Sequence, residues 1–166
     1  MFATIGYEKC SLDDFVATLV DRKIEVLVDI RDRAQSRRRG FSKTALAEAV
    51  GDAGIDYIHI KALGDPKEGR EAARAGLMDK FRKIFIAVLS EETAQNALSE
   101  VESLAKEKKI CLMCYERDHH VCHRKIVSDH LERALGCKAI HLGVPTNAAE
   151  EFAKGRVFHT RESAAA

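Results

Sequence analysis

The segment from Cys111 to Arg124, CLMCYERDHHVCHR, contains three cysteines, three histidines, a glutamate and an aspartate within fourteen residues. Thiolates and imidazoles bind soft metal ions, and the same groups act as nucleophiles and bases in catalysis. Arginine in such a segment also binds phosphate. A metal site, a thiol nucleophile and a phosphate-binding loop are therefore the three chemistries to distinguish.

Strand alternation separates the first two cysteines of this segment. Residues three apart on a strand point to opposite faces, so Cys111 and Cys114 cannot close on one ion while both lie on a strand. Cys111 and Arg117 are separated by five residues, as in cysteine phosphatases, but those residues are bulky and include no glycine. Backbone amides therefore cannot curl round a phosphate there. We expect Cys111 to be a core residue.

Cys122, His123 and Arg124 are predicted to begin a helix, where free amides and the helix dipole favour anions. A thiol there loses its proton more easily, so we expect Cys122 to be a thiolate, with Cys114 at a neighbouring strand tip. Three interpretations stay open: a metal site, catalysis with Glu116 or His123 moving protons, or a buried small side chain beside an ordinary helix start. The spacing matches no standard zinc pattern, so no metal and no cofactor are predicted.

The whole chain has the size and composition of one globular domain. It contains 166 residues, of which 46% are hydrophobic, and its formal net charge is +1. A chain of this length buries an ordinary core, and the near-zero charge indicates neither a generally basic nucleic-acid binder nor an acidic tail. We predict a single α/β domain over residues 1–143 and an extension over residues 144–166 with a flexible end.

Composition also argues against several classes of protein. No apolar run approaches the ~20 residues of a membrane helix, and the first residues lack the pattern of a secretory signal. The five cysteines are odd in number and unevenly spaced, so reduced thiols are expected. These features predict a cytoplasmic protein that does not contact a membrane. Chains of this class often form homodimers, but no exposed apolar stripe marks an interface.

Short β-rich runs alternate with helical periods, which is typical of an α/β domain. We predict a three-layer, Rossmann-like fold with helices on both faces of a mostly parallel sheet of about five strands. The predicted strands cover residues 2–5, 24–30, 55–60, 109–115 and 138–142. Helices are predicted from Ser11, over residues 42–53, over residues 77–107 as one or two helices, and over residues 122–135 before Gly136, while residues 61–76 are predicted to form a loop.

Chemically versatile residues follow four of the predicted strands. Ligands of open α/β sheets bind outside the carboxyl ends of the strands, because loops and helix N-termini meet there. The residues at these ends include Gly6, Tyr7, Asp29, Arg31, Gly64, Cys114 and Glu116. Asp29 and Arg31 project together, and they form either a structural ion pair or part of a ligand site.

The loop after the second predicted strand, residues 31–40, contains five arginines among ten residues. A solvated run of charge is the usual explanation, but the planar guanidinium group also suits phosphate or carboxylate. We favour anion binding by Arg31, Arg37 and Arg38 together with Arg124.

Several motifs of the chain are together typical of one protein family. TIGY after the first strand, VDIR with SRRRGFSK, GIDYIHIKALG, and CYE followed by CHR resemble the signature of domain-of-unknown-function family 488, from Thr4 to His141. The resemblance implies a single α/β domain of a mostly bacterial and archaeal family and no particular activity. It marks Gly6, Asp29, Arg31, Ser36, Phe41, Leu63, Gly64, Cys114, Glu116, Cys122, His123 and Arg124. The chain departs from the family pattern at Ala34, where proline is common, and at Asp65, where a second glycine is common.

The main hypothesis is a small enzyme that binds a phosphorylated, nucleotide-like or nucleic-acid ligand at the carboxyl edge of the sheet. The residues expected to bind it are Gly6, Tyr7, Arg31, Ser36, Arg37, Arg38, Gly64 and Arg124, and those expected to carry proton transfer or nucleophilic attack are Asp29, Cys114, Glu116, Cys122 and His123. The alternatives are a non-enzymatic nucleic-acid-binding module that uses the arginine-rich loop, and a metal- or redox-responsive protein.

Overall fold

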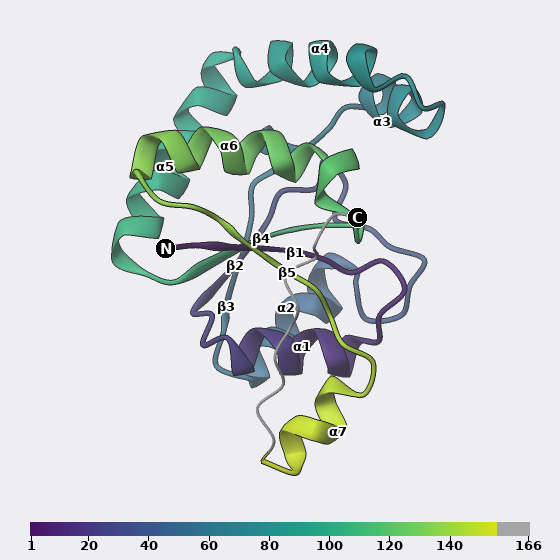
Figure 1. The fold of residues 1–166 in the computed structure, drawn as a ribbon, viewed down its shortest axis with the longest axis vertical. Coiled ribbons are helices and arrows are strands. Elements are labelled where there is room, and N and C mark those ends of the chain that lie inside the picture. Colours follow the sequence, from purple (N-terminus) through teal and green to yellow (C-terminus); the bar gives the residue numbers. More distant parts are fainter. Residues whose placement is uncertain (156–166) are drawn as a thin grey trace.

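The computed structural model describes residues 1–155, which form a five-stranded sheet between layers of helices (Figure 1). The strand order is β3-β2-β4-β1-β5, and all neighbouring strands are parallel, so the predicted α/β class is confirmed. The strands are β1 (Ala3–Gly6), β2 (Val26–Asp29), β3 (Asp56–His59), β4 (Ile110–Cys114) and β5 (Ile140–Leu142). The helices are α1 (Leu12–Asp21), α2 (Lys43–Asp52), α3 (Lys67–Arg74), α4 (Met78–Leu89), α5 (Glu92–Glu107), α6 (His123–Leu135) and α7 (Ala148–Ala153), with 3-10 turns η1 (Lys61–Leu63) and η2 (His119–Val121).

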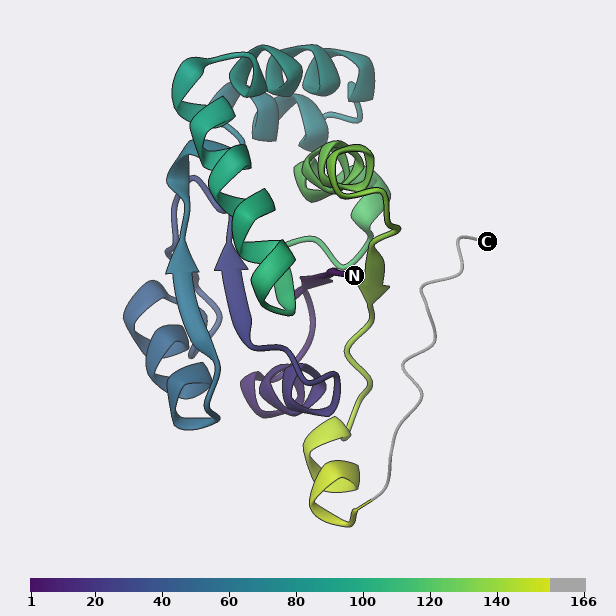
Figure 2. The same ribbon diagram turned by 90° about the vertical axis from the view of Figure 1, so that its left-hand side faces the viewer.

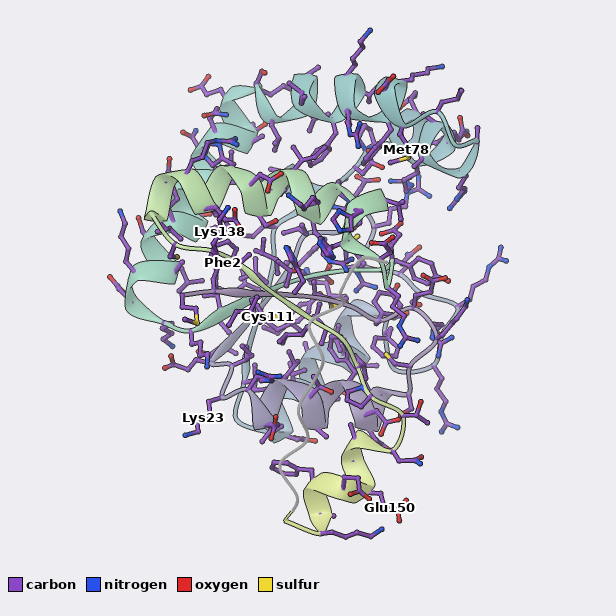
Figure 3. All side chains as sticks on the ribbon, in the orientation of Figure 1. Phe2, Lys23, Met78, Cys111, Lys138 and Glu150 are labelled. Atoms are coloured by element: carbon purple, nitrogen blue, oxygen red, sulfur yellow. The ribbon has the colours of Figure 1, made fainter. Side chains whose placement is uncertain are left out.

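Two hydrophobic clusters hold the helices against the two faces of the sheet. Helices α3 to α6 lie on one side, and α1 and α2 lie on the other, with α7 packed on α1 (Figures 1 and 2). Alternate residues of β4 divide between the clusters, so that Leu112 joins Phe85 on the first face and Cys111 joins Phe15 on the second. Cys111 lies at the centre of the molecule (Figure 3) and is fully buried, which confirms it as a core residue.

From β1 the chain first adds strands toward one edge of the sheet, β2 and then β3, and it later adds β4 between β2 and β1 and then β5 at the opposite edge. Helices α1 and α2 connect β1, β2 and β3 on one face, whereas α3 to α6 lead to β4 and β5 on the opposite face. The connections after the neighbouring strands β2 and β4 therefore diverge, and a crevice opens at their carboxyl ends. The register places Asp29 beside Met113 and Gly6 beside Cys114, which aligns the three strand tips.

Local sequence signals set several helix boundaries. Oγ of Ser11 accepts a hydrogen bond from the backbone N of Asp14 at 3.1 Å and caps α1. Helix α2 begins after Ser42, and α6 ends at Gly136, whose φ of 63° lies in the left-handed region that glycine tolerates. The predicted boundaries at these three positions are confirmed.

The prediction of a loop over residues 61–76 is wrong, because that segment contains η1 and α3. Pro66 immediately precedes α3 with a φ of −66°, an angle that proline adopts readily at a helix start. Leu63 and Ala72 are buried in the cluster on the α3 side of the sheet. The glycines in this segment locally favour a loop, but burial of its apolar side chains stabilises the helix instead.

The C-terminal part of the described chain contains a short helix, α7. The backbone N of Ala149 donates to Oδ1 of Asp14 at 3.0 Å, which ties α7 to α1. The boundary after residue 143 stays a prediction, and the end of the extension, which was expected to be flexible, lies outside the described residues. Among residues 1–155, no helix has both the length and the apolar character needed to cross a membrane.

Two stacked imidazoles join β5 to the turn before α6. The ring centroids of His119 and His141 lie 3.7 Å apart, and Nδ1 of His141 is 2.8 Å from Oγ1 of Thr4. Burial, His119 and the positive charge of Arg124 lower the pKa of His141 to about 4. The folded protein therefore keeps this ring neutral at a pH where an unfolded histidine is protonated.

We predict that His141 contributes to a loss of stability in acid. Its pKa is lower in the folded chain than in the unfolded one, so stability falls as the pH decreases through the window from about 6.5 to about 4. The His141→Asn variant cannot take up this proton. Urea unfolding above about pH 7 and near about pH 5 should therefore show a smaller acid loss for the variant than for the wild type. An equal or larger loss in the variant contradicts the prediction.

Candidate functional site

A cavity of about 900 Å³ lies at the carboxyl edge of the sheet, at the crevice between the diverging connections. The arginine loop (residues 31–40), the end of β4 with the loop after it, and the segment from Asp65 through α3 surround it. Its lining residues are Tyr7, Arg31, Asp32, Arg33, Gln35, Ser36, Arg37, Arg38, Asp65, Lys67, Arg70, Glu71, Arg74, Cys114, Tyr115, Glu116 and His123. The structure thus brings the ends of β1, β2 and β4 to one hollow.

A buried ion pair lies at the end of β2. Arg31 donates from Nε to Oδ1 of Asp29 at 2.8 Å and from Nη2 to Oδ2 at 2.6 Å. Its Nη1 donates to Oη of Tyr7 at 3.0 Å and to the carbonyl of Phe41 at 2.8 Å. The hydroxyl of Tyr57 donates to Oδ2 of Asp29 at 2.6 Å. The pair therefore connects β2 with β3, with the residue after β1 and with the segment before α2.

These contacts favour a structural role for Asp29. Burial would lower the pKa of Arg31, but the hydrogen bonds and charge of Asp29 outweigh it and raise that pKa. Burial and the hydrogen bond to Asp29 also raise the pKa of Tyr57. Asp29 is 0% exposed, and it is not among the residues that line the cavity. Of the two interpretations open for the pair, the geometry favours the ion pair for Asp29, while Arg31 still reaches the cavity wall.

The arginine loop is folded by its own polar groups. Oγ of Ser36 accepts from the backbone N of Arg38 at 3.1 Å. The guanidinium of Arg38 donates to the carbonyl of Cys10, which ties the loop to the connection after β1. Arg33 and Arg37 are exposed and line the cavity. The loop therefore presents cations at the mouth of the cavity from a fixed backbone.

Helix α3 supplies further cations that sequence analysis did not assign to the site. Lys67, Arg70 and Arg74 line the cavity, and their spacing places them on one face of the helix. Nη1 of Arg70 donates to Oδ2 of Asp32 at 3.0 Å and also to the carbonyl of Asp65. The helical spacing of these side chains was visible in the sequence, but the prediction of a loop concealed its meaning.

The floor of the cavity consists of the buried thiol of Cys114, the buried imidazole of His123 and the half-buried carboxyl group of Glu116. Sγ of Cys114 lies 3.3 Å from Oε2 of Glu116 and 3.6 Å from Nδ1 of His123. Nε2 of His123 donates to the carbonyl of Ile30 at 2.9 Å. Because a carbonyl only accepts, Nε2 carries the hydrogen and Nδ1 is left for the thiols. Cys122 lies behind them as the N-cap of α6, where its Sγ accepts a backbone hydrogen bond at 3.5 Å.

The floor groups perturb one another's ionisation. Burial raises the pKa of Glu116 to about 7, and the neighbouring Cys122 adds to this effect. Burial would lower the pKa of His123, but the hydrogen bond and charge of Cys122 raise it to about 9. Burial would raise the pKa of Cys122, yet Cys114, Arg124 and His123 bring it well below its usual range. Burial raises the pKa of Cys114. This environment favours negative charge on the sulfur pair beside a protonated imidazole.

Arg124, Gly6 and Gly64 were expected to bind ligand, but they do not line the cavity. Arg124 is 1% exposed, and it donates from Nη1 to the carbonyl of Glu116 and from Nη2 to the next carbonyl at 2.9 Å. A Cβ at Gly6 would lie 1.8 Å from the carbonyl oxygen of Glu116, and one at Gly64 would lie 2.3 Å from the backbone N of Asp32. These residues shape the loops that form the cavity.

Asp65 brings a buried carboxylate to the cavity. It is 5% exposed, and its Oδ1 has no hydrogen-bond partner among residues 1–155. Burial raises the pKa of Asp65 to about 6, although the positive charges of His123 and Arg70 lower it. Gly69 leaves room for the carboxylate, since a Cβ there would lie 1.9 Å from Oδ1. In the sequence, Asp65 is distinguished only as a departure from the family pattern.

Two groups of side chains within residues 1–155 have the composition of metal ligands. In the first, one ligand atom each from Cys114, Cys122 and His123 lie within 4.8 Å of one another, and all three residues are buried. The second lies at η2 and consists of Asp118, His119 and His120, of which the first and last are exposed. Cys111 belongs to neither group, as strand alternation predicted.

Comparison with known proteins identifies one family. The family model described as domain of unknown function DUF488 matches residues 11–131. The matched segment includes the arginine loop, α3, the floor residues Cys114, Glu116 and His123, and Cys122 behind them. No curated protein and no solved structure gives a match.

We predict that the Asp29–Arg31 pair is a main determinant of stability. The Arg31→Met variant would leave the carboxylate of Asp29 buried without its counter-charge, and such a loss costs about 3–5 kcal/mol. Urea unfolding measures this change. Lys67→Met is the control, because it breaks a pair with Glu71 whose side chains are 75% and 59% exposed, and such pairs contribute at most about 1 kcal/mol. Similar losses in the two variants would refute a dominant role for the buried pair.

Proposed function

The chain belongs to the DUF488 family, and we propose that it is an enzyme that binds a phosphorylated, nucleotide-like ligand in the cavity at the carboxyl edge of the sheet. The observation that carries this proposal is the combination of cationic walls with a floor of thiol, imidazole and carboxyl groups. A cavity in which such polar and ionisable groups converge is the usual setting for substrate binding and catalysis.

The walls supply the charge for an anion. Seven arginine or lysine side chains line the cavity against four acidic ones. Arg31 and Arg70 already have carboxylate partners, whereas Arg33 and Arg37 lie exposed at the mouth. Guanidinium groups bind phosphate oxygens in pairs, with stronger bonds than neutral donors make. The phosphate is therefore held by Arg33, Arg37 and Arg38, of which Arg38 also donates to the carbonyl of Cys10. Lys67 of α3 adds a further cation to the same cavity.

Aromatic side chains favour a ligand with a planar ring. Tyr115 lines the cavity with 43% of its surface exposed, and its ring meets that of Tyr7 edge to face at 5.2 Å. Tyr7 is itself fixed by stacking on Phe41 and by its bond to Arg31. An exposed tyrosine next to arginines offers stacking for a base while the phosphate is held. This is the reason to propose a nucleotide rather than inorganic phosphate.

The floor supplies the chemistry. Glu116 lines the floor of the cavity with its Oε2 3.3 Å from Sγ of Cys114, so it can exchange a proton with a thiol or with a bound ligand. Nδ1 of His123 is directed to the same place because Nε2 is held by Ile30. We assign proton transfer to Glu116 and the positioning of the loops around it to Arg124 and Arg31.

One observation supports the alternative of a non-enzymatic nucleic-acid-binding module. Arg39 is exposed but does not line the cavity, so the cationic surface of the arginine loop extends beyond it. A polynucleotide could follow that surface and would show strong salt dependence without turnover.

We predict that nucleoside monophosphates bind at the arginine loop. Loss of a charge-assisted phosphate contact costs about 1.5–3 kcal/mol, so Arg33→Gln and Arg37→Gln should each weaken AMP or GMP binding roughly tenfold or more. Isothermal titration calorimetry measures the affinities. Arg133→Gln is the control, because Arg133 lies near the other end of α6 and is exposed. Equal affinities for the two loop variants and the control would contradict the binding site.

We predict that Glu116→Gln abolishes turnover while it preserves binding. General acid–base groups contribute about 10²–10⁴ in rate, and glutamine cannot exchange the proton. Product formation from nucleoside mono- and diphosphates and short single-stranded oligonucleotides would be followed by chromatography. Glu71→Gln, which removes an exposed carboxylate from the same cavity, is the matched control. If the wild type binds these ligands but converts none of them, the proposal of an enzyme is contradicted and the alternative of a non-enzymatic binding module is favoured.

A further inference from the structure

Three soft ligand groups meet at the floor of the cavity, and we propose that Cys114, Cys122 and His123 form a zinc site. Two sulfurs and one imidazole nitrogen lie mutually within 4.8 Å, and all three residues are buried. Two cysteines and a histidine are a ligand set found at catalytic zinc ions. The chain spacing of these residues matches no standard zinc motif, so the proposal depends on their positions in space.

The separations fit a tetrahedral ion. Zn–S bonds of about 2.3 Å and Zn–N bonds of about 2.0–2.1 Å place a sulfur and a nitrogen roughly 3.5 Å apart on a tetrahedron. Sγ of Cys114 and Nδ1 of His123 are 3.6 Å apart. This pair therefore already has the separation that one ion requires, and Sγ of Cys122 lies within 4.8 Å of both atoms.

The groups around the three ligands already orient them. Nε2 of His123 donates to the carbonyl of Ile30 at 2.9 Å, and a ring held in this way by its second nitrogen is the usual arrangement for a metal-binding histidine. Sγ of Cys122 accepts from the backbone N of Arg124 at 3.5 Å. Such a hydrogen bond stabilises a thiolate ligand.

Charge balance also favours zinc. On binding, the three ligand groups release their remaining protons to solvent, including the proton on Nδ1 of His123, so that two thiolates and a neutral imidazole bind the ion. Two thiolates then neutralise a divalent cation, so no net charge is buried in the ligand set. Thiolate and imidazole ligands select zinc over magnesium or calcium, which prefer oxygen.

The geometry leaves one coordination position toward the cavity. Cys114 and His123 line the cavity, whereas Cys122 lies behind them. Three protein ligands are typical of catalytic zinc, whose fourth position holds water. Glu116 lines the same cavity with its Oε2 3.3 Å from Sγ of Cys114, and in the proposed site it would take a proton from that water. The zinc site deepens the proposed function by indicating hydrolysis, but its existence does not require the nucleotide assignment.

Metal content is the test. Protein purified without chelators, supplied with Zn²⁺ and dialysed into metal-free buffer should retain about one zinc per chain by elemental analysis. Cys122→Ser and His123→Gln should lower this retention by roughly tenfold or more. Cys137→Ser is the matched control, because Cys137 follows the opposite end of α6 and lies outside the cavity. Wild-type protein that retains no zinc, or a Cys122→Ser variant that retains as much as the wild type, overturns the site.

A second measurement uses only the wild-type chain, in case the variants do not fold. Protein loaded with Co²⁺ should show thiolate-to-metal charge transfer in the near ultraviolet and the intense visible bands of a tetrahedral ion. A weak octahedral spectrum without charge transfer would overturn the proposal. If the protein binds nucleotides but retains no zinc, only the zinc site is contradicted. If the protein retains zinc but binds no nucleotide, only the proposed nucleotide ligand is contradicted.

Discussion

The buried Asp29–Arg31 pair is the interaction on which the arrangement of the site depends. One guanidinium binds both carboxylate oxygens of Asp29, the hydroxyl of Tyr7 and the carbonyl of Phe41. Tyr57 completes the network from β3. A buried charge is tolerated only when it is paired and hydrogen-bonded, so these partners are held in fixed positions. The network therefore fixes both Tyr7, which lines the cavity, and Arg31, the first residue of the arginine loop.

Two kinds of side chain line the cavity: long cationic side chains at the walls, and short, buried cysteine and histidine side chains at the floor. Long arginine and lysine side chains can adjust to an anionic ligand from a fixed backbone. The floor instead uses cysteine and histidine, whose positions are set by the end of β4, the start of α6 and the carbonyl of Ile30. Ligand capture and precise geometry are thus assigned to different residue types.

Much of this arrangement follows from local signals. Strand alternation assigned Cys111 to the core, Ser11 and Gly136 marked helix ends, and the rule for parallel sheets indicated the carboxyl edge. Local signals do not reveal a role that a residue plays through backbone packing. Gly6 was predicted to bind ligand from its place after β1, and the structure shows that its lack of a Cβ makes room for the carbonyl of Glu116. Such a contact joins loops far apart in the chain, so no local pattern encodes it.

The sequence by itself determined the α/β class, the order of the strands and the edge at which polar residues gather, because hydrophobic period and helix capping are local properties. Only the tertiary structure decided which of these residues meet. It placed Asp29 in an ion pair, turned Arg124 to the loop carbonyls and brought α3 to the cavity. It also brought Cys114 to Cys122 and His123. These outcomes depend on burial and on the divergence of two neighbouring connections, which are properties of the packed chain as a whole.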